Sequence, residues 1–568
     1  MAVSDASQPP AMVSPVSTPD AIPDAAPDAI VVGSGATGGV AALALAQAGL
    51  QVLVLEAGPE LSAPRAFGSE PLNSLKRVAS LSAGRQRIAA QHPGYWKANP
   101  ELYVDEVDNP YSTPADRPFL WSRGRQVGGK SLTWGGITLR LSDFEFAAAE
   151  RDGHGHSWPI RHADLDPWYG QLETLLQVHG QRDGLPQLPD GCYQNALPLT
   201  PGERHLQQCI GRDLNLPLIP SRGFRLRNPA EGPWPRSCSQ GGALAAALAT
   251  GRVRVQSQAV VSHVLVDPRT GRASGVEWVD GRDRGQRHVQ RAALVVLCAS
   301  TIESLRLLLH SQAVGGLEEV SGLLGQGLMD HISASSFFAL PPQPAAGATE
   351  LSGAGSCFIP NTVNLGEASG EATNFRRGYG LWCGVQRFDP PAPLKRQRQA
   401  AIGFLIGHGE VLSQPHNRVS LHPQRCDAWG IPIAHIDCHW GDNERRLVDH
   451  MQARMQAVVA SAGGTIRPLE ELFVMPLLEP LVRSSTALAP GAAPPGYYIH
   501  ELGGAPMGSS EATGVVNRWN QLWRTPNLLV TDGSCWPSAG WQSPTLTEMA
   551  LTWRACDHAA AALKRGEL

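Results

Sequence analysis

The sequence lacks closely spaced cysteines, a long apolar run and a strong excess of charge of one sign. Its ten cysteines are spread over 568 residues, and no two are closer than twelve positions. This spacing argues against a zinc ribbon or a local iron–sulfur loop, so we expect no metal site. No apolar run is long enough to span a membrane. Because 47 basic residues stand against 51 acidic ones, we expect no nucleic-acid partner.

The N-terminal segment lacks the features of an export signal. Residues 1–27 contain no Lys or Arg and no continuous apolar stretch, so no signal peptide is predicted. Their Pro, Ala, Ser and Asp content predicts a disordered tail. Sparse, scattered cysteines fit reduced thiols, and we therefore expect a cytoplasmic protein.

Glycine and proline, in contrast, are abundant. The chain holds 60 Gly and 46 Pro, which predicts many long loops. Hydrophobic residues make up 42%, enough for a large core. We interpret the chain as a large composite globular protein in which regular elements alternate with extended connections.

A strand, a glycine turn, a helix and a second strand follow the tail. The strands are expected at 29–32 and 51–55, and the helix at 40–48. Such a unit favours a right-handed crossover between two parallel strands. The chain is therefore predicted to belong to the α/β class, with a Rossmann-like domain near its start.

The turn of this unit carries the pattern Gly33-x-Gly35-x-x-Gly38, and Glu56 follows the second strand. Glycines at these places allow a tight turn and bring a pyrophosphate to the N-terminus of the helix. A carboxylate at position 56 is suited to hydrogen bonds with ribose hydroxyls. The pattern predicts a dinucleotide site and does not separate NAD from FAD.

Further elements are predicted along the rest of the chain. Residues 60–125 look irregular, and 341–378, rich in Pro, Gly, Ala and Ser, are expected to form a long loop. A helix is expected after Asp164. Strands are predicted at 253–255, 260–266, 275–279, 292–298, 417–421 and 527–531, and helices at 303–310, 442–462 and 546–564.

Two more motifs suggest ligand contact. The first is a glycine block in which backbone could lie against a flat or phosphorylated ligand, although a purely structural glycine loop is the alternative. Its candidate residues are Arg125, Gly128, Gly129, Ser131, Trp134 and Gly135. The second motif lies near the C-terminus, where an Asp-Gly pair ends a predicted strand. Its candidate residues are His500, Asp532, Gly533, Ser543 and Thr547.

Taken in order, these motifs resemble the glucose–methanol–choline (GMC) flavin oxidoreductases. Two further segments support the resemblance, Ala299–Leu309 and the Leu324–His331 stretch that ends in Asp-His. The similarity extends from about residue 28 to the C-terminus. Within the family the sequence looks closest to the bacterial FAD-dependent glucoside 3-dehydrogenase group, on segments such as Trp158-Pro-Ile and Val516–Leu522.

The resemblance implies how the domains are arranged. An FAD-binding domain would be assembled from discontinuous segments at 28–334, with inserts at about 60–120 and 156–245, and from a C-terminal return at 500–568. A substrate-binding domain with an antiparallel sheet and helices would occupy 335–499. The overall fold would then be α+β around a Rossmann-like core.

The resemblance also implies roles for the candidate residues. Glu56 would bind the adenosine ribose and Val261 would lie against the adenine. The residues of the glycine block would face the pyrophosphate and isoalloxazine, and Asp532 with Gly533 would approach the ribitol and pyrophosphate. His500 would act as general base while Ser543 orients the substrate hydroxyl.

Two departures from the family pattern, and one position at which relatives differ among themselves, bear on function. Only Cys238 remains where the nearest group carries a cysteine cluster suited to an iron–sulfur centre. Ser543 stands where the family has a second His or Asn, and a hydroxyl cannot act as a base at neutral pH. Thr133 occupies the place at which some relatives attach FAD through His, so non-covalent FAD is implied.

We therefore expect an FAD-dependent enzyme that oxidises a secondary hydroxyl of a sugar, glycoside or sugar-bearing metabolite to a ketone. The proton would pass to His500 and the hydride to flavin N5. The electron acceptor, oxygen or an external acceptor, is left open, as is export with a partner subunit. Two alternatives stay open as well: an oxidase of a non-sugar alcohol, and a non-redox lyase that retains FAD.

Overall fold

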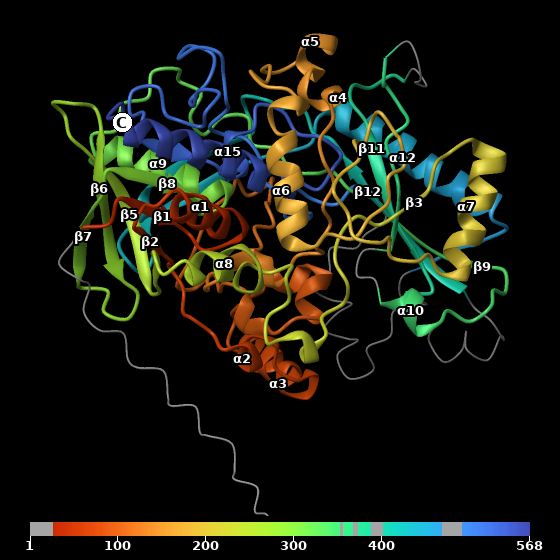
Figure 1. Ribbon diagram of the computed structural model, residues 1–568. Helices are drawn as coiled ribbons and strands as arrows, with labels where there is room; N and C mark the ends of the chain where they lie inside the picture. Colours follow the sequence, from red (N-terminus) through yellow and green to blue (C-terminus); the bar gives the residue numbers. More distant parts are fainter. Residues whose placement is uncertain (1–25, 353–355, 367–372, 388–400, 469–490) are drawn as a thin grey trace, which may run out of the picture.

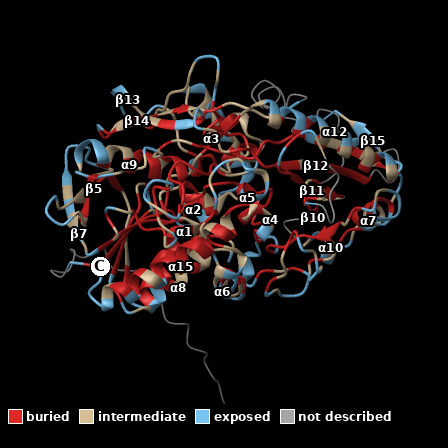
Figure 2. Cartoon of the chain, turned by 90° about the horizontal axis from the view of Figure 1, so that it is seen from above, coloured by how far each residue is buried: buried red, intermediate tan, exposed pale blue. Residues whose placement is uncertain are grey.

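The computed structural model describes residues 26–352, 356–366, 373–387, 401–468 and 491–568. The predicted N-terminal tail therefore falls almost wholly outside the described residues. Two large sheets lie side by side in the molecule, a parallel one and an antiparallel one, with helices packed around both (Figure 1). Buried residues follow these sheets and the helices between them (Figure 2).

The first sheet is parallel and has the strand order β16-β8-β1-β2-β4. Its strands are short, and all but the edge strand β4, which carries Arg254 and Gln256, are apolar and buried, as expected for strands covered on both faces. The crossover from β1 to β2 is helix α1 (Ala36–Gln47), which packs against α8 (Ala243–Ala249) and α15 (Thr545–Lys564). The strands are β1 (Ala29–Val32), β2 (Val52–Leu55), β4 (Val253–Gln256), β8 (Leu294–Leu297) and β16 (Leu528–Val530).

This sheet confirms the predicted Rossmann-like unit and shows that distant segments complete it. Strand β8, more than 200 residues after β1 in the sequence, pairs with β1. Strand β16, from the last 50 residues of the chain, pairs with β8 and forms the edge of the sheet. A meander of three antiparallel strands joins β4 to β8, and α9 (Thr301–Val314) packs on it. Its strands are β5 (Ala259–Val266), β6 (Ala273–Asp280) and β7 (Arg287–Arg291).

The second sheet is antiparallel in the order β15-β9-β12-β11-β10-β3. Helices α7 (Pro201–Leu214) and α12 (Asp442–Ser461) pack in one core with it. The strands are β3 (Ile219–Pro220), β9 (Ser335–Leu340), β10 (Cys357–Ile359), β11 (Tyr379–Val385), β12 (Ala401–Gly409) and β15 (Thr465–Arg467). Because β3 and α7 precede residue 335, this layer draws on more of the chain than the predicted substrate domain. The domain boundaries themselves stay a prediction.

Two regions differ from the predicted elements. The expected loop at 341–378 contains β10, an interior strand of the second sheet, and the short helix α10 (Ala348–Leu351). Strand β10 has only three residues, which pair with β11, and two of them also pair with β3. Three residues are too few to show the alternation of a strand. The irregular stretch at 60–125 contains α2 (Ala63–Phe67) and the thirteen-residue helix α3 (Glu70–Ser82).

The remaining elements connect the two sheets. Helix α6 matches the helix predicted after Asp164, and β13 extends the predicted strand at 417–421 into a hairpin with β14. These elements are α4 (Asp143–Phe146), α5 (Ala148–Asp152), α6 (Asp166–Leu176), β13 (Arg418–Cys426) and β14 (Pro432–Asp437). No helix in the described part of the chain is both long and apolar enough to cross a membrane.

Candidate active site

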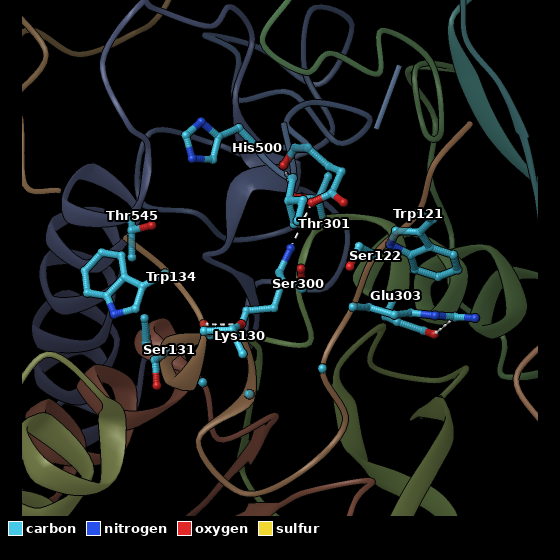
Figure 3. A pocket seen from close by; sticks show the side chains of 18 of the residues that line it. Trp121, Ser122, Lys130, Ser131, Trp134, Ser300, Thr301, Glu303, His500 and Thr545 are labelled. Atoms are coloured by element: carbon cyan, nitrogen blue, oxygen red, sulfur yellow. Dashed lines mark hydrogen bonds and ion pairs between the residues drawn. The ribbon is translucent and has the colours of Figure 1, made fainter. Parts of the chain in front are cut away.

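One cavity of about 630 Å³ lies between the two sheets and collects segments from the whole chain. It reaches from the glycine turn after β1 to the inner face of the antiparallel sheet. Figure 3 shows Lys130, Ser131, Trp134, Thr301 and His500 gathered around it. Twelve predicted site residues line it: Gly33, Gly35, Glu56, Arg125, Gly129, Ser131, Trp134, Gly135, Val261, His500, Asp532 and Ser543.

The other four predicted residues lie outside the cavity lining, where they shape the turns around it. A Cβ on Gly38 would lie 2.0 Å from the Gly33 carbonyl oxygen, and one on Gly533 would lie 2.6 Å from Thr301 Oγ1. The Gly128 N–H donates to Ser34 Oγ at 3.0 Å. The Thr547 hydroxyl is hydrogen-bonded to the Tyr169 hydroxyl at 2.7 Å, which ties α15 to α6.

The three glycines of the first turn serve different purposes. Gly33 has φ +99°, and a Cβ there would lie 2.4 Å from the Cys298 carbonyl oxygen. Gly38 is held by close packing against Gly33, as described above. Gly35 has an ordinary φ of −67°, and a Cβ there would meet no atom of the described residues within 4 Å. Protein packing thus accounts for Gly33 and Gly38, whereas Gly35 leaves open space at the N-terminus of α1.

Glu56 is buried at the wall of the cavity, in a network with the same turn. Its Oε2 accepts hydrogen bonds from Ser34 N (3.1 Å) and Ser34 Oγ (2.5 Å), and its Oε1 accepts from Gly58 N (2.9 Å). Burial raises the pKa of the carboxyl, and these hydrogen bonds with the charge of Arg125 oppose that rise. The carboxylate is therefore fixed in orientation at the end of β2.

The glycine block folds back over this turn. Gly129, with φ +52°, comes so close that a Cβ there would lie 3.3 Å from the Gly35 Cα. Ser131 Oγ donates to the Gly128 carbonyl at 2.6 Å and accepts from Ser239 N at 2.8 Å. Trp134 Nε1 donates to the Ser237 carbonyl at 2.9 Å. The block presents backbone and an indole to the cavity and is held from behind by residues 237–239.

His500 approaches the cavity from a constrained segment. The preceding residue, Ile499, has φ +63°, a conformation that β-branched residues rarely adopt. Asp330 holds this segment: its Oδ1 accepts the backbone N–H of His500 at 2.9 Å, and its Oδ2 accepts that of Gly496 at 3.0 Å. Strain of this kind persists where the surroundings enforce it, often at functional sites.

The electrostatic surroundings keep His500 uncharged. Burial lowers the pKa of His500 well below its usual range, and the neighbouring His331, His408 and Lys130 lower it further. Its ring nevertheless lines the cavity. A neutral imidazole in such a place has a lone pair available for a proton from a bound molecule.

A second and a third histidine surround His500, and neither was a candidate from the sequence. His331 Nδ1 lies 2.7 Å from His500 Nδ1. His408, on the inner face of β12, has its ring centroid 6.1 Å from that of His500 and is hydrogen-bonded to the Tyr498 hydroxyl through Nε2. The Asp-His pair at 330–331 belongs to the sequence prediction only as part of the resemblance, and His408 belongs to no motif.

In the described part of the chain no group of three His, Cys, Asp or Glu side chains is placed to hold a metal ion.

Ser543 also lines the cavity, from the loop before α15. Its Oγ is buried and has no hydrogen-bond partner among the described residues. A buried hydroxyl without a partner is costly, so a ligand group that bonds to it would be favoured.

Lys130 is a further cavity residue that the sequence did not single out. Its ammonium donates to Glu501 Oε2 at 2.8 Å, and the attraction of that carboxylate raises the pKa of Lys130 against the effect of burial. Figure 3 shows the side chain extending from the glycine block toward the segment that carries His500. An ammonium–carboxylate pair is thus part of the cavity lining.

The substrate-side wall is formed by alternate residues of three neighbouring strands. Phe404 pairs with Phe337, and Ile406 pairs with both Ser335 and Trp382. These side chains line the cavity together with His408. Because alternate residues of a strand point to one face, a single sheet face supplies an aromatic and aliphatic wall that contains one histidine.

A βαβ nucleotide fold joined to an antiparallel sheet, with a histidine between them, is typical of enzymes that use a dinucleotide cofactor. Family comparison agrees with this geometry. Two GMC oxidoreductase models match the chain, one over residues 27–333 and the other over residues 413–552. The chain therefore belongs to the GMC oxidoreductases, a flavin-dependent family of alcohol and sugar dehydrogenases and oxidases.

Proteins to which the chain is similar along most of its length are distant in sequence. The 2-methyl-1,2-propanediol dehydrogenase of Mycolicibacterium austroafricanum is 27% identical over 93% of this chain and 94% of its own length. The fructose dehydrogenase large subunit of Gluconobacter japonicus is 24% identical over 94% and 98%. Paromamine 6'-oxidase of Streptomyces fradiae is 27% identical over 94% and 91%. A crystal structure of pyridoxine 4-oxidase from Mesorbium loti has the same fold, with TM-score 0.59 and 18% identity over 95% and 99% of the two chains.

Proposed function

We propose that this protein binds FAD non-covalently and oxidises a hydroxyl group of a small molecule, in the first place a secondary hydroxyl of a sugar or glycoside, to the carbonyl. One observation carries the proposal: the neutral His500 lines the same cavity as the glycine turn and Glu56. A base and a dinucleotide cradle thus face one continuous space.

The residues present fit FAD. Gly35 leaves open space at the N-terminus of α1, where backbone N–H groups favour a pyrophosphate. Glu56 would hold the ribose, Val261 would lie on the adenine side, and Gly129, Ser131, Trp134, Gly135 and Asp532 would flank the pyrophosphate and flavin. Arg125 belongs to the same lining. Thr133 offers no ring nitrogen for a covalent link, so acid precipitation of the yellow protein should release free FAD.

The chain's own groups would act on the hydroxyl as follows. The imidazole of His500 accepts the hydroxyl proton, and the unpartnered Ser543 Oγ bonds to the same oxygen and fixes its position. Lys130 places an ammonium group, paired with Glu501, next to the segment that carries His500. When bound, FAD supplies the acceptor for the hydride that leaves the carbinol carbon.

A sugar-type substrate is supported by the relatives named for fructose and paromamine. His408 and Tyr498, which are hydrogen-bonded to each other, add polar groups to the same cavity. A second candidate, an alcohol with an apolar body, is favoured by the wall formed by Phe337, Trp382, Phe404 and Ile406. The electron acceptor, oxygen or an external acceptor, stays open, and the cytoplasmic location stays a prediction.

The test measures anaerobic bleaching of the bound flavin by a panel of hydroxyl compounds. Methyl and phenyl glycosides of the same sugar, and a simple aromatic alcohol, separate the two substrate classes. We expect at least one glycoside to bleach the flavin, and we expect the flavin to stay oxidised when no substrate is added. Photoreduction of the flavin with no bleaching by any hydroxyl compound would contradict the proposal and favour the lyase alternative. Peroxide formation in air would identify an oxidase.

A further inference from the structure

We infer that His331 is a positioning residue that fixes the tautomer of His500, so that the Nε2 lone pair of His500 faces the cavity. The inference rests on the proposed role of His500 as the base and extends it to a residue outside the cavity lining. The argument starts from the hydrogen bonds that each ring nitrogen makes.

The first step concerns Nε2 of His331, the ring nitrogen that does not contact His500. Its Nε2 lies 2.6 Å from the Gly540 carbonyl oxygen, and a carbonyl oxygen only accepts hydrogen bonds. The proton of the ring must therefore sit on Nε2. His331 is buried, with 2% of its surface exposed, and no carboxylate of the described residues bonds to its ring. Burial lowers the pKa of His331 to about 4, so the ring carries a single proton at neutral pH.

The second step follows from that single proton. With Nε2 protonated, Nδ1 of His331 has a lone pair and can only accept. Its partner at 2.7 Å is Nδ1 of His500, which must then donate. The single proton of neutral His500 is thereby placed on Nδ1, and its Nε2 keeps the lone pair. The Gly540 carbonyl thus determines, through two rings, which nitrogen of His500 is basic.

The backbone makes this geometry rigid. Asp330 Oδ1 accepts the N–H of His331 at 2.8 Å and that of His500 at 2.9 Å, so one carboxylate holds the two histidine backbones together. Ile499, directly before His500, has the left-handed φ of +63°, so the backbone that carries His500 is itself constrained. A residue behind a catalytic histidine often sets its tautomer in this manner.

The arrangement also matters after proton transfer. When His500 Nε2 takes the hydroxyl proton, the ring becomes an imidazolium with protons on both nitrogens. Its Nδ1–H continues to donate to the lone pair of His331 Nδ1, and no further proton has to move. The hydroxyl oxygen keeps the electron pair of the broken O–H bond, which forms the carbonyl as the hydride leaves for the bound FAD. His331 thus stabilises the charged base without becoming charged itself.

The experiment compares His331→Leu with His331→Asn in the FAD-loaded enzyme. Leucine removes the acceptor, whereas the asparagine carbonyl oxygen offers one close to the position of Nδ1. We expect H331L to lower the limiting rate of anaerobic flavin reduction about 100-fold, a typical share of general-base catalysis. FAD content and the substrate dissociation constant should stay within about twofold, and H331N should recover most of the rate. His205→Leu is the matched control, because His205 Nε2 also lies near a backbone carbonyl, at 3.1 Å from Ala462 O, but outside the cavity.

Two results would overturn the inference: an unchanged rate in H331L, or equal losses in H331L and H331N. A His500→Ala variant separates the two proposals, since a loss there with an unchanged H331L contradicts only the role of His331. If H331L does not fold, ¹⁵N spectra of histidine-labelled wild-type holoenzyme still decide. His500 resonances, assigned by their absence in H500A, should show a protonated Nδ1 and an unprotonated Nε2. The reverse assignment would contradict the inference.

Discussion

At the scale of single residues, the account depends on a histidine that stays neutral where other histidines would be charged. The pKa of His500 is lowered by burial first, and then by His331, His408, Lys130 and His92. Asp330, whose pKa burial raises to about 7, contacts only the backbone of His500 and not its ring. The basic form of His500 is therefore present above its lowered pKa and is lost only when the pH falls through that value.

This predicts that the rate of flavin reduction begins to fall only at an unusually low pH. The limiting rate of anaerobic flavin reduction should stay constant as the pH falls from 8 through about 6.5, the ordinary pKa of histidine. Stopped-flow measurement at saturating substrate gives the profile. A rate that falls tenfold per pH unit already below pH 7 would contradict a depressed pKa at His500.

Ser543 gives the second prediction at this scale. Its Oγ has no partner among the described residues, so a bound hydroxyl would be its first hydrogen bond. Ser543→Ala should lower kcat/KM about fivefold, equivalent to ~1 kcal/mol for one neutral hydrogen bond, and FAD content should not change. Ser543→Asn supplies an amide and should keep or raise the activity. Loss of FAD in either variant would assign Ser543 to the structure of the α15 loop instead.

The candidate site was only partly predictable from single residues. Gly35, Glu56 and His500 could be named because each belongs to a motif with a fixed spacing, and all three line the cavity. His408 lies on a strand whose sequence has no such motif, and only the pairing of β12 with β11 brings it to the cavity. Contacts between residues this far apart in sequence depend on tertiary packing, which local patterns do not encode.

At the scale of elements, the turn between β1 and α1 contains one glycine that protein packing requires and one that we assign to the ligand. Both Gly35 and Gly38 belong to the same fingerprint, but a Cβ at Gly38 would lie 2.0 Å from a backbone oxygen and one at Gly35 would meet nothing. Gly38→Val should destabilise the protein by about 3 kcal/mol or more through overpacking. Gly35→Val should leave the stability of the apoprotein within about 0.5 kcal/mol but abolish FAD binding.

Urea unfolding of the apoproteins and flavin absorbance of the purified variants check this pair. Retention of FAD by Gly35→Val would mean that the pyrophosphate does not pass the N-terminus of α1. Equal destabilisation by both substitutions would contradict the assignment of Gly35 to the ligand.

Elements with strong periodicity or a long apolar run were predicted well. The crossover unit, α12 and α15 agree with their predicted ranges to within a few residues, apart from the earlier start of α1. Helix α3 was missed because it lies in a stretch whose prolines and arginines obscured its pattern, and its Leu72 and Leu75 are exposed. Strand β10 was missed because three residues carry too little alternation.

At the scale of the whole molecule, the cavity is the place where distant parts of the chain meet. Segments near residues 35, 130, 260, 300, 408, 500 and 543 all line it. A ligand that fills it would contact both sheets and stabilise the folded state as a unit. Free FAD at 100 times its dissociation constant should then add about 2.7 kcal/mol to the free energy of unfolding of the apoprotein.

Urea unfolding of the apoprotein with and without FAD measures this increment, and Gly35→Val is the matched control that should not respond. An apoprotein whose unfolding midpoint does not move with FAD would contradict a cofactor site at the junction of the sheets.

The most direct test of the central claim is single-turnover flavin reduction in His500→Ala. The variant should purify yellow, because His500 contributes a side chain to the cavity and no part of the glycine cradle. With the substrate that bleaches the wild-type protein under anaerobic conditions, its rate of flavin reduction should fall by about 10²–10⁴-fold. An FAD-loaded H500A variant that is reduced at the wild-type rate would contradict the account.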